Sequence, residues 1–252
     1  MNDVKKINQR FFFTLVLFIF IILLGIGAMI LSNLFIPNVD LQYVIYFVSL
    51  IGMIVAGGMF QTRFTRLTNT AYLIKIRHHA SPALPMRHTL KLDQMPSVLK
   101  EQGYTRYAVD QSHTLFYRVT KDTIKRMLTK YMLEVVVLIE GHIDEFYLSA
   151  VDEEINRIQE TYLKERKRME RILITQIKPI HDLSVETKDK IKEIFFLKTR
   201  EVSLFLRARS TVISTINVGL HKPSNTALML YSDTYSPSLY YTHHIEQIKS
   251  ML

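Results

Sequence analysis

The sequence lacks cysteine and tryptophan, and it contains only eight glycines among 252 residues. The absence of cysteine excludes a disulfide framework, thiol catalysis and any metal site with thiolate ligands. The glycine-rich motifs G-x-G-x-x-G and G-x-x-x-x-G-K-[ST], which bind nucleotide phosphates, are also absent, and so are G-x-S-x-G and H-E-x-x-H. The sequence therefore gives no motif for nucleotide binding, serine hydrolysis or zinc-dependent hydrolysis, and we expect no cofactor.

Charge is missing from two long apolar stretches near the N-terminus. Residues 11–36 and 41–60 contain no charged side chain, and each reaches the roughly 20 residues that a helix needs to cross a bilayer. A buried helix of a globular domain would carry a polar stripe, which neither stretch has. The first stretch is also longer than the roughly 7–15 apolar residues of a signal peptide. We therefore expect transmembrane helices at 11–36 and 41–60, joined by an outer loop at 37–40.

Basic residues around these stretches predict the orientation of the helices. The N-terminal segment 1–10 contains Lys5, Lys6 and Arg10, whereas the loop contains no basic residue. The segment after the second stretch carries Arg63, Arg66, Lys75 and Arg77. Because Lys and Arg accumulate on the cytoplasmic side, we expect an integral membrane protein with both termini in the cytoplasm. Neither stretch contains an ionisable residue, as a carrier or proton path would, so we expect an anchor in the lipid bilayer.

The rest of the chain is predicted to form a cytoplasmic domain. Residues 61–252 hold 29 basic and 21 acidic residues, so this part is basic. A Pro-containing break at 81–85 favours a membrane-proximal connector at 61–89, in which 71–76 could form a strand. The remaining segment, 90–252, is long enough to bury a core. We expect it to fold as one compact mixed α/β (α+β) domain.

Hydrophobic periodicity and capping residues predict the elements of this domain. Helices are expected at 93–102, at 120–131, from Ser149 through a capping box, from Ser184 as an N-cap, and from Ser236 as an N-cap followed by proline. Strands are expected at 104–109, 114–119, 133–139, 172–177, 202–206, 211–218 and 227–231. Interleaved helices and strands of this kind indicate a layered sheet with helices on its faces.

The expected elements over residues 93–178 resemble the core order of the restriction-endonuclease-like fold, which is a helix, three strands, a helix and a strand. The resemblance implies a metal site with an acidic residue on one strand and an acid-x-Lys motif on the next. The third strand here reads Glu134-Val135-Val136, so valine occupies the lysine position. The preceding hairpin offers only Asp110, in an expected turn. We therefore expect the catalytic pattern of an active nuclease to be broken.

Glu134 interrupts an otherwise apolar strand, and two interpretations follow. Glu134 and Glu140 are six residues apart and share a face of the strand. With His142 and Asp144 they offer oxygen and nitrogen ligands for a divalent ion, which would suit a membrane-tethered metal-dependent enzyme. The alternative, which we favour, is that Glu134 pairs with a basic residue and the segment from Glu140 onward is a polar loop.

Clusters of basic residues suggest anionic partners. Arg63, Arg66, Lys75 and Arg77 follow the second apolar stretch, where they would lie near anionic lipid headgroups. A second basic patch comprises Lys164, Arg166, Lys167, Arg168 and Arg171. Aromatic residues on the expected hairpin lie near Arg106 and Arg118; they are Tyr104, Tyr107, Phe116 and Tyr117. This would suit base stacking in a nucleic-acid-binding protein, but alternating aromatics on a strand are more typical of a core.

The function predicted from these features is non-enzymatic. The anchor is clear, and no catalytic constellation rises above chance. We expect a membrane-anchored scaffold or accessory protein whose basic α/β domain binds a partner protein or a membrane component. The two alternatives are a membrane-tethered metal-dependent enzyme centred on Glu134 and Glu140, and a membrane-tethered nucleic-acid-binding protein.

Overall fold

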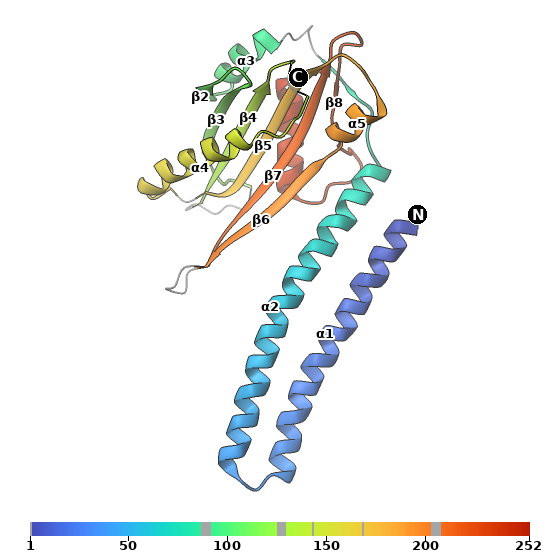
Figure 1. Cartoon of the computed structure of the whole chain (residues 1–252), viewed down its shortest axis with the longest axis vertical. Coiled ribbons are helices and arrows are strands. Elements are labelled where there is room, and N and C mark those ends of the chain that lie inside the picture. Colours follow the sequence, from blue (N-terminus) through green and yellow to red (C-terminus); the bar gives the residue numbers. More distant parts are fainter. Residues whose placement is uncertain (1, 87–91, 125–129, 143, 168, 203–207) are drawn as a thin grey trace. The chain divides into compact units, whose positions relative to one another are not determined.

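The structure is a computed structural model that describes residues 2–86, 92–124, 130–142, 144–167, 169–202 and 208–252. The chain divides into two compact units, Met1–Lys75 and Ile76–Leu252. The first unit is a helical hairpin, and the second is built around a mixed β-sheet (Figure 1). This is the expected arrangement of two long apolar helices followed by a mixed α/β domain.

The hairpin consists of α1 (Asn2–Phe35) and α2 (Val39–His78). Both helices are long and apolar enough to cross a membrane, and most of their apolar side chains are exposed rather than covered by other parts of the chain. Phenylalanine side chains join the two helices: the rings of Phe11 and Phe64, and those of Phe18 and Phe60, have centroids 5.2 Å apart. The Asn38 side chain begins α2 by accepting from the backbone N–H of Asp40 at 3.0 Å.

Helix α2 continues well beyond the apolar stretch that ends at residue 60. The strand considered for 71–76 is therefore wrong, because these residues belong to the last turns of α2. No proline or glycine interrupts the chain between 59 and 78, so the helix propagates without a break. It ends shortly before Pro82, where the expected break in regular structure lies.

The second unit contains an eight-stranded sheet. Its strands are β1 (Leu84–Pro85), β2 (Thr105–Val109), β3 (His113–Lys121), β4 (Tyr131–Ile139), β5 (Met169–Ile180), β6 (Ile194–Val202), β7 (Ala208–His221) and β8 (Thr226–Leu228). The order is β1-β8-β7-β5-β4-β3-β2, and β6 pairs with the first part of β7. Strands β4, β5 and β7 are parallel, and the other pairs are antiparallel. The carboxyl ends of the three central strands therefore lie at one edge of the sheet.

Helices cover both faces of the sheet (Figure 1). They are η1 (Leu92–Gln94), α3 (Met95–Glu101), α4 (Ser149–Lys164), α5 (Val185–Ile191) and α6 (Leu239–Met251). Alternate residues of β4, such as Leu133 and Val135, belong to a large core under α4. The residues between them face the other way, where Met132 packs with Tyr240 of α6. We refer to these as the α4 face and the α6 face.

Several expected elements are confirmed. The β2–β3 hairpin and its turn at 110–112 are present, with the Asp110 N–H bonded to the His113 carbonyl at 2.9 Å. Gly103 follows the end of α3, and its φ of 82° is the left-handed conformation that glycine favours there. The Ser184 hydroxyl caps α5 by accepting from the Thr187 N–H at 3.2 Å.

The helix expected at 120–131 is wrong at its two ends. Thr120 and Lys121 extend β3, Tyr131 begins β4, and the two strands pair as far as Lys121 opposite Tyr131. Residues 125–129 lie outside the described part of the chain. Within the described residues, α3 is thus followed by three strands, α4 and a strand, and strand pairing occupies residues 120, 121 and 131 of the expected helix.

Some boundaries also need correction. The capping box at Ser149 is wrong, because Leu148 is the N-cap of α4 and no side chain caps the helix. The N-cap of α6 is Ser238 rather than Ser236, and its hydroxyl accepts from the Tyr241 N–H at 3.2 Å. Strand β6 has no counterpart among the expected strands. Most of the strand expected at 202–206 lies outside the described residues.

Candidate functional site

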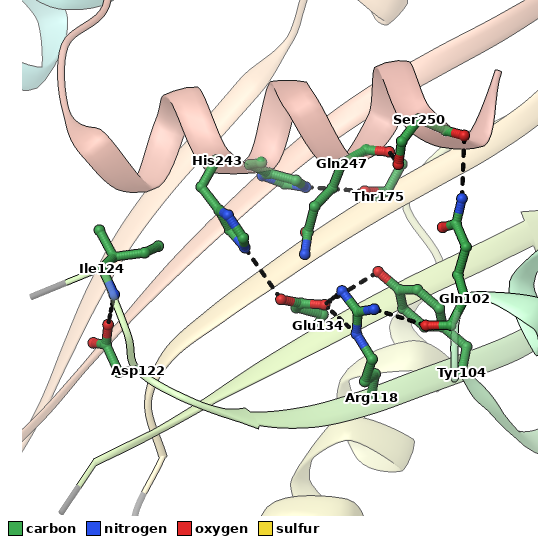
Figure 2. Close-up of polar contacts among 11 residues, drawn as sticks. Gln102, Tyr104, Arg118, Asp122, Ile124, Glu134, Thr175, His243, Gln247 and Ser250 are labelled. Atoms are coloured by element: carbon green, nitrogen blue, oxygen red, sulfur yellow. Dashed lines mark hydrogen bonds and ion pairs between the residues drawn. The ribbon is translucent and has the colours of Figure 1, made fainter. Parts of the chain in front are cut away.

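Glu134 lies at the centre of a polar network on the α6 face (Figure 2). Its carboxylate is 2% exposed. One oxygen, Oε2, accepts from Arg118 Nε at 2.7 Å and from Arg118 Nη2 at 2.5 Å, and also from the Tyr104 hydroxyl at 3.3 Å. The other oxygen lies 3.3 Å from His243 Nε2 of α6. The carboxylate therefore has partners on both oxygens.

The network continues from Glu134 towards the ends of two helices. Arg118 donates through Nη1 to the backbone carbonyl of Gln102 at 2.7 Å, and its guanidinium lies 4.7 Å from the centroid of the Tyr104 ring. The Gln102 side chain donates to the Ser250 carbonyl at 3.1 Å (Figure 2). These contacts join α3, β3, β4 and α6, so the network connects one side of the sheet to the helices that cover it.

Electrostatics favour an ionised Glu134. Burial alone would raise the pKa of this carboxyl, but the hydrogen bond from His243 and the charge of Arg118 outweigh burial and hold the pKa below its usual range. Burial and the neighbouring carboxylate raise the pKa of the Tyr104 hydroxyl, so Tyr104 remains a neutral donor. Glu134 is therefore a buried carboxylate with a full set of donors, as expected if it pairs with a basic residue.

The structure does not bring the other expected metal ligands to Glu134. Glu140 follows β4, and six residues of extended strand separate the two Cα atoms by about 20 Å. His142 and Asp144 are exposed in the segment after the strand. Among the residues that the structure describes, no group of three or more His, Asp or Glu side chains could hold a metal ion.

The expected basic patch is divided between the two faces of the sheet. It comprises Lys164, Arg166, Lys167, Arg168 and Arg171. Lys164 and Arg166 are exposed at the end of α4, and Lys167 pairs with Glu165 at 2.8 Å. Arg171 lies on β5 with its guanidinium 4.4 Å from the Tyr240 ring centroid on the α6 face. Arg168 lies outside the described residues. The four expected membrane contacts, Arg63, Arg66, Lys75 and Arg77, are exposed on α2.

A serine, a histidine and a glutamate that the sequence analysis missed form a chain between the β2–β3 turn and α4. The Ser112 hydroxyl lies 2.8 Å from Nδ1 of His113, whose Nε2 lies 3.0 Å from the Glu154 carboxylate. His113 is fully buried. The three residue types and their contacts match those of a catalytic nucleophile, a general base and an acid that orients the base.

The surroundings of this chain favour a structural role. The Asp110 carboxylate lies 3.3 Å from the Ser112 hydroxyl, where it would repel a developing oxyanion. The neighbouring backbone N–H groups of Asp110, Gln111 and Glu140 already have acceptors, at 2.9, 2.7 and 3.0 Å. We therefore assign the chain to fastening the turn onto α4.

The α4 face contains a pocket of about 570 Å³ beside α4, which we call the α4 pocket. Its lining residues are Tyr147, Val151, Asp152, Ile155, Asn156, Gln159, Ile174, Gln176, Ile213 and Thr215. Apolar side chains form most of the wall, and the buried side chains of Gln176 and Thr215 lie on the sheet floor. Within the described part of the chain, neither of these two side chains forms a hydrogen bond. Their polar atoms are not among the fully enclosed unpaired ones, so they are open to water or to a ligand in the pocket.

Sequence reasoning missed this pocket, although a signal for it exists. Strand β5 is apolar except for a few positions, and Gln176 and Lys178 interrupt it at a spacing of two, which places them on the same face. Glu134 attracted attention for the same reason. The contribution of α4 and β7 depends on tertiary packing, so the sequence alone does not reveal it.

Scans against protein-family models, curated proteins and solved structures found no match to this chain.

Proposed function

We propose that this chain is a membrane-anchored binding protein of non-enzymatic character. Helices α1 and α2 anchor it in a bilayer as a hairpin, with both termini and the α/β domain on the cytoplasmic side. The domain binds a partner protein through the α4 pocket. The distribution of basic residues around the two helices supports this topology.

The α4 pocket is the observation that carries the proposal. Its volume of about 570 Å³ falls in the range of specific ligand sites. Apolar walls suit an inserted apolar side chain, while the amide of Gln176 and the hydroxyl of Thr215 suit the peptide groups beside it. A protein segment carries both kinds of group, which is why a protein partner fits the pocket well.

The length of α2 beyond the apolar stretch determines which basic residues can contact lipid headgroups. At about 1.5 Å per residue, Arg63 and Arg66 lie within about 10 Å of the end of the apolar stretch, whereas Lys75 and Arg77 lie about 20–25 Å beyond it. The headgroup layer extends only about 5–8 Å beyond the hydrocarbon on each side. For a helix close to the membrane normal, we propose Arg63 and Arg66 as the headgroup contacts.

The test is site-specific photo-cross-linking of the full-length protein in its own membranes. A photoreactive residue at Asn156, which lines the α4 pocket, should give a discrete adduct with a partner protein. The matched control is the same residue at Arg157, which is exposed on α4 but does not line the pocket. Mass spectrometry of the adduct would then identify the partner.

A second variant ties the adduct to the pocket itself. Thr215→Phe fills the floor of the pocket and should abolish the Asn156 adduct, while leaving the circular dichroism spectrum of the protein unchanged. Equal adducts from positions 156 and 157, or an Asn156 adduct that survives Thr215→Phe, would contradict the proposal.

The two alternative functions find less support. A metal-dependent nuclease would need free carboxylates, yet Glu134 is neutralised by Arg118 and Val136 occupies the position of the lysine. A nucleic-acid-binding surface would need several exposed aromatic rings, yet Tyr104 and Phe116 are buried. Tyr107 is exposed, and its ring packs edge-on against that of Tyr117. Binding of a protein partner therefore remains the function that the geometry favours.

A further inference from the structure

A second pocket, of about 380 Å³, lies at the carboxyl end of β5 on the α4 face, and we call it the β5-end pocket. Its lining residues are Gly141, Asp144, Phe146, Lys178, Pro179, Ile180, His181, Asp182, Ser184, Glu186, Thr187 and Lys190. Three segments converge here: the loop after β4, the end of β5, and α5. The crevice beyond the carboxyl ends of parallel strands is the general position of ligand sites in open α/β sheets.

Lys178 is the central feature of this pocket. It is 8% exposed. No other described residue forms a hydrogen bond or an ion pair with its ammonium group, which lies 5.8 Å from the centroid of the Phe146 ring. The side chain is largely buried but its ammonium is not fully enclosed, so its donors are open to water or to an acceptor in the pocket. Burial lowers the pKa of Lys178, which is consistent with an incompletely stabilised cation.

The other charged groups around the pocket are mostly engaged. Glu186 pairs with Lys190 at 3.2 Å, and Asp182 accepts from the Thr187 hydroxyl at 3.0 Å. Asp144 influences Lys178 electrostatically without forming an ion pair with it, and the neighbouring His181 is exposed. The uncompensated charge that faces into the pocket from the sheet is therefore that of Lys178.

We propose that the β5-end pocket binds a small organic ligand through a carboxylate group that pairs with the Lys178 ammonium. A monoanionic carboxylate matches one ammonium. A phosphate dianion would meet twice the repulsion from Asp144, Asp182 and Glu186, and protein phosphate sites commonly supply several N–H donors. The proposal concerns a different pocket from the α4 pocket and does not depend on the partner proposed there.

The test uses the wild-type full-length protein in detergent micelles, with acetate and inorganic phosphate as probes. Amines are trace-labelled with an N-hydroxysuccinimide ester, and labelling of each lysine is read by peptide mass spectrometry at constant ionic strength, with chloride as the reference. Acetate at about twice its dissociation constant should slow labelling of Lys178 about threefold by mass action. Labelling of Lys222, an exposed lysine that does not line the pocket, should not change.

A charge-removing variant sharpens the test. Asp144→Asn should speed labelling of Lys178 in chloride, because loss of the carboxylate lowers the pKa of this lysine further, and should lower the acetate concentration needed for half protection, because a repelling carboxylate is removed. Equal labelling of Lys178 in acetate and chloride would overturn the proposal. Stronger protection by phosphate than by acetate would overturn the assignment to a carboxylate, and weaker protection in Asp144→Asn would make Asp144 part of the binding group instead of a competitor.

Discussion

Replacement of Glu134 should destabilise the domain as strongly as truncation of its core. Glu134→Ala removes a carboxylate that is 2% exposed and leaves the Arg118 guanidinium, with 28% of its side chain exposed, without its counterion. Breaking a buried ion pair from one side costs about 3–5 kcal/mol, and the partial exposure of Arg118 favours the lower end of that range. The expected loss in the free energy of unfolding is therefore about 3 kcal/mol.

The assay is urea unfolding of the full-length protein in detergent micelles, followed by circular dichroism. Val136→Ala is the matched control, because Val136 is buried two residues further along the same face of β4. Loss of its two methyl groups should cost about 2 kcal/mol. A double-mutant cycle with Arg118→Met should give a coupling energy of about 2 kcal/mol between Glu134 and Arg118.

Two results would refute this reasoning. A loss below about 1 kcal/mol for Glu134→Ala would mean that the carboxylate is poorly satisfied in the folded domain. A coupling energy near zero would mean that Arg118 does not stabilise it. If, in addition, Mg²⁺ raised the urea midpoint of the wild-type protein but not that of Glu134→Gln, the metal-dependent alternative would gain the support that it now lacks.

Three further predictions concern other parts of the α/β domain. Burial lowers the pKa of His244 to about 3. Below about pH 6.5 the unfolded chain therefore binds a proton that the folded domain does not, and the free energy of unfolding should fall by up to about 1.4 kcal/mol per pH unit. Urea titrations between pH 7.5 and 5 should show that this free energy depends less steeply on pH in His244→Gln than in the wild type, and an equal dependence would contradict the prediction. Gly219→Ala would place a Cβ 2.6 Å from Cδ1 of Ile191. We expect the free energy of unfolding, measured by urea, to fall by about 1–2 kcal/mol. An unchanged value would mean that α5 moves freely to make room. Glu154→Ala should lower the free energy of unfolding by about 1–3 kcal/mol because buried His113 loses its acceptor. In the wild-type protein, Ser112 should not react with a fluorophosphonate. Labelling of that serine would favour a hydrolase instead.

Much of the fold could be predicted from local patterns. The charge-free stretches predicted α1 and α2, and the β-branched run around Val135 predicted β4, because these segments are apolar for longer than any surface element would be. The helix expected from Thr120 failed for the opposite reason. Its apolar positions fit a helical period, but Lys121 at the end of β3 pairs with Tyr131 at the start of β4. The energy of strand pairing comes from residues distant in the sequence, so the spacing of apolar residues within one segment does not reveal it.

The candidate sites were less predictable than the fold. Glu134 could be singled out as a polar interruption of an apolar strand, and its pairing with a basic residue was expected, but the choice of Arg118 follows from the antiparallel register of β3 and β4. The α4 pocket combines residues of α4, β5 and β7, which are adjacent only because the sheet order places β7 beside β5. A single sequence contains no direct signal for that order.

The two faces of the sheet differ in where their polar groups line a pocket. On the α6 face, both carboxylate oxygens of Glu134 are paired, and the buried His244 Nδ1, which has no partner among the described residues, lines neither of the two pockets described above. On the α4 face, the side chains of Gln176 and Lys178 form no hydrogen bond to described residues, and each lines a pocket. Their polar atoms are not among the fully enclosed unpaired ones, so water or a ligand in the pockets can pair with them. We therefore propose the pockets of the α4 face, rather than the Glu134 network, as the ligand sites.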